Sequence, residues 1–181
     1  MQRNRNTDVM ELIRPETAAD APDVRRVHEA AFPTSAEADL VERLRASSKA
    51  VIALVAEDEG RIVGHIVFSP VALAPLAGAI GLGLAPVAVQ PDHEKHGVGR
   101  RLIQNGLSEC RKWGADFVVV LGDPAYYGRF GFEPASEHEL KSEYGAGEEF
   151  MVFELNKGAM PPRGTLVKYA PEFAGLESPK G

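Results

Sequence analysis

The chain has 181 residues, of which 44% are hydrophobic and 25% are charged, and its formal net charge is −6. This length suits one domain with one core, and the composition is that of an ordinary globular protein. The acidic balance and the lack of a long basic patch argue against nucleic acid as the main partner.

Cys110 is the only cysteine, so the chain cannot form an internal disulfide. A reducing compartment fits this usage, and we expect a cytoplasmic protein in which Cys110 is a core thiol rather than a nucleophile. Residues 1–9 are polar, with no apolar stretch behind them, which predicts a tail and not a signal peptide. A single domain is expected over 10–171, followed by a C-terminal tail over 172–181.

The segment 62–91 contains no Asp, Glu, Lys or Arg, and it is long enough to suggest a membrane helix. Pro70, Pro75 and Pro86 interrupt it, however, and proline is unfavourable inside a helix. We therefore expect no transmembrane segment, and instead two buried strands divided by a turn at 75–78.

The hydrophobic pattern predicts an alternation of strands and helices along the chain. Strands are expected at 10–13, 51–56, 61–68, 80–89, 117–121, 149–155 and 166–169. Helices are expected from the N-cap Asp20 to Pro33, from a Thr34–Glu37 capping box through Leu44, from Val98 to Gly114, and briefly from Asp123 to Gly131.

The strand–helix–strand unit over 80–121 predicts one parallel strand pair, because such crossovers join parallel strands. The hairpin pattern around 57–60 predicts antiparallel pairing elsewhere. The expected fold class is therefore α+β, with a mixed, mostly antiparallel twisted sheet flanked by helices.

The most informative stretch is 87–103, which reads as a strand, a polar turn and a glycine-punctuated helix start. This order places backbone N–H groups without helical partners at the positive end of a helix dipole, where a phosphate or diphosphate binds well. Gly97 and Gly99 do not make a dinucleotide fingerprint, because Leu102 stands at the third glycine position and the turn is too long. A Walker loop is excluded because Gly-Lys-Ser/Thr is absent.

Two motifs in this region together resemble the GNAT superfamily of acyl-CoA-dependent N-acyltransferases. The family's diphosphate loop, Gln/Arg-x-x-Gly-x-Gly/Ala, is similar to Glu94-Lys95-His96-Gly97-Val98-Gly99, and it follows Val89-Gln90-Pro91. The family's Tyr-x-x-x-Gly-Phe element is matched by 127–132, one strand further on. The sequence of residues 121–127, Leu-Gly-Asp-Pro-Ala-Tyr-Tyr, also resembles the bacterial YhbS-like branch of the superfamily.

The resemblance implies a GNAT-like sheet whose parallel strand pair splays apart at a cleft for acetyl-CoA. It assigns contacts with acetyl-CoA to residues of one strand and the loop after it: Val87, Ala88, Val89, Glu94, Lys95, His96, Gly97, Val98, Gly99 and Arg100. Glu94 departs from the family pattern, because a carboxylate repels a diphosphate unless it points into solvent or pairs with a cation. We expect backbone amides to carry most of the contact.

The resemblance also implies that an amine attacks the thioester directly, with an N–H of the strand at 87–89 stabilising the oxyanion. Tyr127 is the expected proton donor to the CoA thiolate, and the neighbouring Tyr126 is expected in the core. The base stays open: Glu37 and Asp123 are explained as helix caps, Asp39 lies near the expected acceptor region, and His28 and His65 are expected to be structural or surface residues. No metal-ligand spacing is present.

The sequence therefore predicts an N-acetyltransferase that uses acetyl-CoA as co-substrate and needs no metal. The acceptor is a primary amine on a small molecule or peptide. The alternative is a catalytically silent acyl-CoA-binding module with a regulatory or interaction role. Homodimerisation is common in the family, but the sequence itself does not show it.

Overall fold

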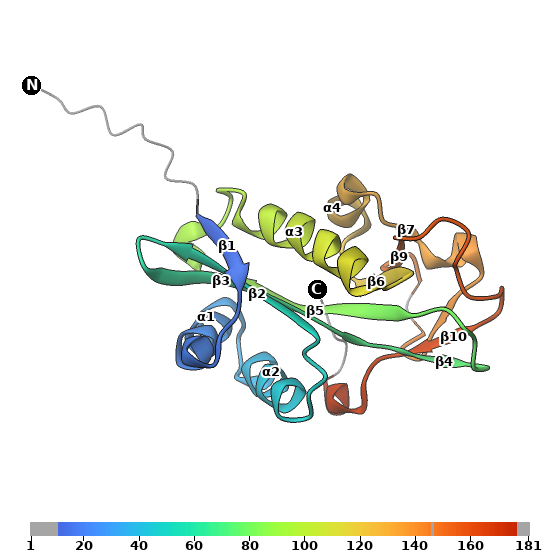
Figure 1. Ribbon diagram of the computed structural model, residues 1–181, viewed down its shortest axis with the longest axis horizontal. Helices are drawn as coiled ribbons and strands as arrows, with labels where there is room; N and C mark the ends of the chain where they lie inside the picture. The colour runs from blue at the N-terminus through green and yellow to red at the C-terminus, as the bar shows by residue number, and fades with distance from the viewer. Residues whose placement is uncertain (1–10, 146, 177–181) are drawn as a thin grey trace, which may run out of the picture.

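A twisted sheet forms the centre of the structure, and helices cover both of its faces (Figure 1). The computed structural model describes residues 11–145 and 147–176, so the expected N-terminal tail and residues 177–181 lie outside the described residues. The strands are β1 Leu12–Pro15, β2 Ile52–Asp58, β3 Arg61–Pro70, β4 Ala72–Ala74, β5 Gly81–Val89, β6 Phe117–Leu121, β7 Glu133–Pro134, β8 Lys141–Ser142, β9 Phe150–Glu154 and β10 Leu166–Lys168.

The helices follow the expected order along the chain. The α-helices are α1 Ala21–Ala31, α2 Ala36–Ala46, α3 Val98–Trp113 and α4 Pro124–Tyr127, and the 3₁₀ turns are η1 Ala18–Asp20, η2 Pro91–His93, η3 Gly128–Phe130, η4 Ala135–His138 and η5 Pro171–Phe173. Within residues 11–145 and 147–176, no helix has the length and apolarity that a membrane crossing needs.

The large sheet has the strand order β1-β2-β3-β5-β6-β9-β7, and the small one has the order β4-β10-β8. In the large sheet β5 and β6 are parallel, whereas the other neighbours pair antiparallel. The structure thus confirms an α+β fold with a mostly antiparallel sheet.

The alternating side chains of β6 divide the core into two layers. Phe117, Val119 and Leu121 pack on the side of α1 and α2, whereas Val118 and Val120 pack on the side of α3. All five side chains are buried, as expected of a strand covered on both faces. Figure 1 shows the same arrangement, with α3 on one side of the sheet and α1 and α2 on the other.

The parallel pair β5–β6 separates along its length. Gly81, Leu82 and Gly83 are in register with 117–119, but the rest of β5 up to Val89 pairs with β3 and not with β6. The second half of β5 therefore has one edge free of β6. The predicted splay is confirmed, and it opens the sheet next to the start of α3.

One expected helix cap is wrong. Helix α2 begins one residue later than expected, with Ser35 as its N-cap, so Thr34 and Glu37 do not form a capping box. Asp20 is the N-cap residue of α1 as predicted, but its side chain does not bond the helix; it accepts hydrogen bonds from Arg14 at 2.8 and 2.9 Å and from the Thr17 N–H at 2.8 Å. The bidentate pair with the Arg14 guanidinium is a strong, charge-assisted interaction, which explains the choice of partner.

The packed part of the chain also continues beyond the expected domain end at residue 171. Phe173 in η5 is fully buried in the core beneath α2, and Glu172 pairs with Lys49 at 2.9 Å. Because these contacts depend on residues far apart in the sequence, local composition could not predict them.

Candidate active site

A cavity of about 830 Å³ lies where β5 separates from β6. Its walls come from the end of α1, the end of β5, the loop into α3, and the segment after β6. The lining residues are Ala31, Phe32, Val87, Ala88, Val89, His93, Glu94, Lys95, Gly97, Val98, Gly99, Arg100, Gln104, Tyr126, Arg129 and Phe130. Every residue that the sequence analysis assigned to acetyl-CoA contact is among them except His96, which is exposed and outside the lining.

The start of α3 supplies the polar end of the cavity. Gly97 is the N-cap with φ 83°, a left-handed conformation that favours glycine. The N–H of Arg101 donates to the Gly97 carbonyl at 3.0 Å, which closes the first turn. The N–H groups of Val98, Gly99 and Arg100 therefore have no helical partner and lie at the positive end of the dipole of α3. This geometry suits an anion.

The side chains around the start of α3 add positive charge. Lys95, Arg100 and Arg129 line the cavity with Glu94, so cations outnumber carboxylates in its wall. Glu94 is exposed, which lets its carboxylate remain hydrated beside a bound anion. Arg129 lies over the ring of Tyr126, 5.0 Å from the ring centroid.

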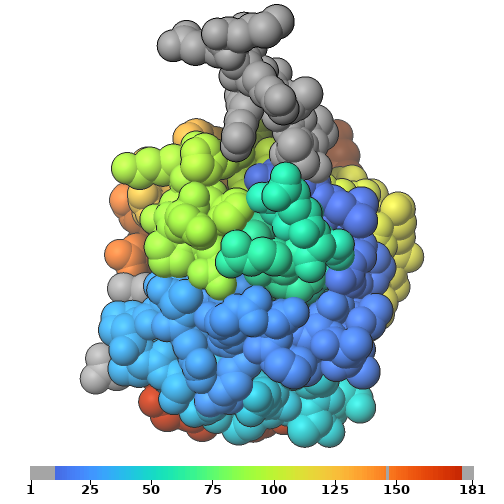
Figure 2. Space-filling model, turned by 90° about the vertical axis from the view of Figure 1, so that its left-hand side faces the viewer, coloured from blue at the N-terminus to red at the C-terminus, as the bar shows by residue number. Residues whose placement is uncertain are grey.

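His93 is a cavity residue that the sequence analysis missed. Its Nε2 lies 3.0 Å from Oδ2 of Asp58, the last residue of β2, and its Nδ1 lies 2.8 Å from Asp92 Oδ1. The hydrogen bonds to Asp92 and Asp58 raise the pKa of His93 despite partial burial. Figure 2 shows the loop before α3 (yellow-green) side by side with the β2–β3 turn (teal). His93 thus ties the loop to the sheet, and its raised pKa favours the protonated imidazolium.

The two neighbouring tyrosines differ in their position relative to the cavity. Tyr126, expected in the core, is half-buried and lines the cavity; a Cβ built on Gly99 would lie 3.3 Å from its hydroxyl. Tyr127 is only 2% exposed, and its ring packs against Gly122 and Phe132. Burial raises the pKa of both phenols, so both hydroxyls are protonated at neutral pH.

The three carboxylates considered as bases lie outside the cavity, and Asp123 caps its helix as predicted. Asp39 accepts from Arg25 at 2.9 Å, and Asp123 caps α4 by accepting from the N–H of Ala125 at 2.9 Å. Glu37, Asp39 and Asp123 are not among the lining residues.

His28 and His65, by contrast, are both fully buried and 2.8 Å apart. His65 faces Ala88 across the β3–β5 register, and His28 lies one helical turn before the cavity residues Ala31 and Phe32. The sequence carried no signal for this pairing, because the two residues lie on different elements.

Cys110 packs in the core under α3 with no exposed surface, as predicted. Burial raises the pKa of its thiol, which disfavours the nucleophilic thiolate. Among the described residues, no group of three or more His, Cys, Asp or Glu side chains has a geometry that could hold a metal ion.

The fold and the loop at α3 place the chain in a known class of enzymes. Residues 12–135 match the family model described as an acetyltransferase (GNAT) domain. The chain belongs to the GNAT family of acyl-CoA-dependent N-acetyltransferases.

Relatives in this family cover nearly the whole chain. N-acetyltransferase YhbS of Escherichia coli K12 is 38% identical over 164 residues, which make up 90% of this chain and 98% of the relative. N-acetyltransferase YjhQ of the same strain is 41% identical over 121 residues, which make up 65% of this chain and 67% of the relative.

Two solved structures share the architecture. The crystal structure of E. coli YhbS in complex with CoA matches with a TM-score of 0.87 at 36% identity, covering 95% of this chain and 96% of that chain. A GNAT acetyltransferase from Brucella melitensis in complex with acetyl-CoA matches with a TM-score of 0.75 at 34% identity. The match covers 90% of this chain and 97% of that chain.

Proposed function

We propose that this enzyme transfers an acetyl group from acetyl-CoA to a primary amine, which attacks the thioester directly through a tetrahedral intermediate. The observation that carries the proposal is the cavity itself, which joins the unpaired N–H groups of α3 to the free edge of β5. The E. coli and Brucella structures of similar fold were solved with CoA and acetyl-CoA, which supports the same co-substrate here.

The diphosphate of the co-substrate fits the start of α3. The N–H groups of 98–100 would donate to its oxygens, and Lys95, Arg100 and Arg129 would offset its charge. Val87, Ala88 and Val89 would contact the pantetheine arm through their backbone, because β5 has no β6 partner there.

The oxyanion of the tetrahedral intermediate would be stabilised by β5. In an antiparallel pair, alternate residues turn their N–H groups away from the partner strand. Beyond Gly83 such groups on β5 point away from β3, toward the side where β6 no longer pairs. An N–H near Val89 in this position would hydrogen-bond the thioester oxygen as it gains charge.

The departing CoA thiolate needs a proton, and we assign its donor to Tyr127, which occupies the tyrosine position of the family motif. The raised pKa of Tyr127 keeps its hydroxyl protonated. Tyr126 is the second candidate, because its side chain lines the cavity. No covalent enzyme intermediate is required, which agrees with the buried and inert state of Cys110.

The experiment is a thiol-release assay with acetyl-CoA and a panel of polyamines, amino acids and short peptides with free amino termini. For an accepted amine, we expect Tyr127→Phe to lower kcat by about 100-fold or more while acetyl-CoA affinity stays the same. Tyr126→Phe is the matched control, expected to change mainly the KM for acetyl-CoA. The opposite pattern would assign proton donation to Tyr126.

The alternative, a catalytically silent acyl-CoA-binding module, makes a different prediction in the same assay. Such a module would bind acetyl-CoA but release no thiol with any amine of the panel, and neither tyrosine variant would alter a rate. Turnover with any amine above the rate of spontaneous hydrolysis excludes it.

A further inference from the structure

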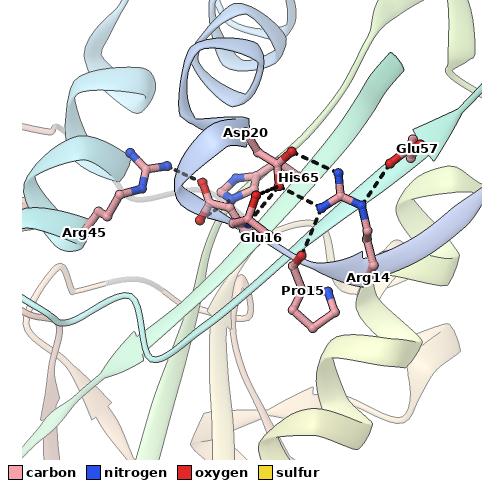
Figure 3. A network of polar contacts seen from close by, with 8 residues as sticks. Arg14, Pro15, Glu16, Asp20, Arg45, Glu57 and His65 are labelled. Carbon is pink, nitrogen blue, oxygen red and sulfur yellow. Dashed lines mark hydrogen bonds and ion pairs between the residues drawn. The ribbon is translucent and has the colours of Figure 1, made fainter. Parts of the chain in front are cut away.

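A line of buried polar side chains begins at His28 on α1, one helical turn before the cavity residues Ala31 and Phe32, and ends at Glu16. His28 Nε2 and His65 Nδ1 are 2.8 Å apart, and His65 Nε2 lies 3.6 Å from Glu16 Oε2. Both histidines are fully buried, and the Glu16 side chain is 8% exposed. Figure 3 shows Glu16 between His65 and Arg45, with the Arg14–Asp20 pair close by.

Each end of this line lies at or beside a hollow of the molecule. His28 precedes the lining residues Ala31 and Phe32 by three and four positions, so the three share one face of α1. Glu16 lines a second hollow of about 460 Å³ together with Arg45 and Glu109. The histidine pair therefore lies between the cavity residues at the end of α1 and the second hollow.

Two nitrogens of the line have no hydrogen-bond partner among the described residues: Nδ1 of His28, and Nε2 of His65, which lies 3.6 Å from Glu16 Oε2. Leaving such a buried group unpaired is costly. The negative charge of Glu16 favours the His65 tautomer with its proton on Nε2. His65 Nδ1 then accepts from His28 Nε2–H, which leaves a lone pair on His28 Nδ1.

We propose that Glu16, His65 and His28 form a proton relay that carries the acceptor amine's proton away from the cavity, through a water molecule hydrogen-bonded to His28 Nδ1. This inference rests on the proposed acetyl transfer. It identifies the base that the carboxylates near the cavity do not supply.

The relay moves protons without changing any oxidation state. An N–H bond of the ammonium breaks, its electron pair stays on the amine nitrogen, and the water passes a proton to His28 Nδ1. The proton of His28 Nε2 moves to His65 Nδ1, and that of His65 Nε2 moves to the Glu16 carboxylate. A proton returning by the same path restores both tautomers and reprotonates the group that gave its proton to the CoA thiolate. The second proton of the amine, which the nitrogen loses after it bonds to the acyl carbon, passes to solvent water.

The surroundings of the relay define its resting protonation state. Burial, with smaller contributions from the neighbouring His65 and Arg45, lowers the pKa of His28 to about 2, so His28 is neutral at rest and does not retain a proton. Burial alone would raise the pKa of Glu16, but His65 and Arg45 outweigh it and lower the pKa, so Glu16 is ionised in the resting enzyme. Arg45 from α2 and Glu16 itself are the charged groups that face the histidine pair.

The tautomers can be measured without an acceptor, by long-range proton–nitrogen NMR on protein with ¹⁵N-labelled histidines. His28→Gln and His65→Gln assign the signals. At neutral pH we expect the ring proton of each histidine on Nε2. A His28 proton on Nδ1, or a doubly protonated His65, would overturn the proposal, because neither leaves a lone pair toward the cavity.

The kinetic test uses the amine that the wild-type enzyme accepts. His65→Gln should lower kcat/KM about 100-fold at pH 7 and recover toward the wild-type value at high pH, where the amine is already neutral. Glu16→Gln should show the same fall in kcat/KM at pH 7 and the same recovery at high pH. Both variants should bind acetyl-CoA as tightly as the wild type. His138→Gln, which removes a partly exposed histidine paired with Glu133, is the matched control and should change nothing.

A structural role makes a different prediction from the relay. If His65 only supports the fold, His65→Gln lowers the rate by the same factor at every pH or weakens acetyl-CoA binding, and the relay is wrong. If wild type accepts no amine while the NMR tautomers are as expected, the proposed transfer has failed and the relay with it. If it accepts an amine and the tautomers differ, the relay alone has failed.

Discussion

Glu94 is the residue at which this chain departs from the diphosphate loop of its family, where glutamine or arginine stands. Its carboxylate is exposed, and the unpaired N–H groups of Val98, Gly99 and Arg100 follow it at the start of α3. Replacing Glu94 by Gln removes a repulsion of about 1 kcal/mol or less in water, so we expect acetyl-CoA to bind up to about fivefold more tightly.

Lys95→Gln is the natural comparison, because it removes the opposite charge from the adjacent exposed position. It should weaken binding by a similar factor, and both effects should shrink at high salt. Calorimetric titrations at two ionic strengths measure both variants. A large loss of affinity in Glu94→Gln would show that the carboxylate makes a required contact.

At the residue scale, the sequence predicted those parts of the site that belong to one continuous motif. Most of the loop from Glu94 to Arg100 lines the cavity because a strand, a turn and a helix start fix its geometry locally. His93 and Phe32 escaped prediction, since their place in the cavity depends on the β2–β3 turn and on the end of α1. Tyr126 and Tyr127 are adjacent in the motif, and spacing alone could not tell which of them faces the cavity.

At the element scale, Gly106 allows α3 to lie close to the sheet. A Cβ at this position would lie 2.4 Å from the ring of Phe68 on β3, too close for any real contact. Gly106→Ala therefore forces the ring or the helix to move, and only part of this cost is offset by the better helix propensity of alanine. We expect a net loss of about 1–2 kcal/mol in the free energy of unfolding, measured with urea.

Gly78→Ala controls for the general effect of removing a glycine. Nothing lies within 4 Å of a Cβ at Gly78, so its stability should stay close to wild type. Equal stability of the two variants would mean that α3 does not depend on the close approach at Phe68.

The elements themselves were predictable wherever the pattern is local. Strand β6 has the bounds that its continuous apolar run predicted. Helix α3 begins where the helical period of apolar residues begins, and it ends before Gly114 as predicted. The small sheet β4-β10-β8 was not predictable, because Ala72 and Lys168 become partners only through the tertiary fold. The burial of Phe173 was not predictable for the same reason, since it depends on contacts with distant residues.

At the scale of the whole molecule, the buried His28 makes stability depend on pH. The pKa of His28 is about 2 in the folded protein and near 6.5 in the unfolded chain, so the unfolded state binds more protons between these values. Stability is therefore highest above pH 6.5 and falls as the pH drops, by about 2 kcal/mol from pH 6.5 to pH 5. His93 acts in the opposite sense, because its raised pKa makes its stabilisation disappear only as the pH rises.

Urea unfolding of wild type and His28→Gln at pH 7, 6 and 5 measures this contribution. The wild-type free energy of unfolding should decline across the series, and that of the variant should decline much less. The comparison concerns the slope, so a uniform loss of stability in the variant does not matter. Parallel slopes would show that His28 is protonated in the folded protein.

The central claim is that the cavity between β5 and α3 binds acetyl-CoA, and calorimetric titration with acetyl-CoA, CoA and NADH tests it most directly. We expect saturable binding of acetyl-CoA and CoA at one site per chain, and no binding of NADH. Binding of NADH without acetyl-CoA would contradict the assignment of the diphosphate loop. Failure to bind either CoA compound would show that this chain has lost the co-substrate of its family.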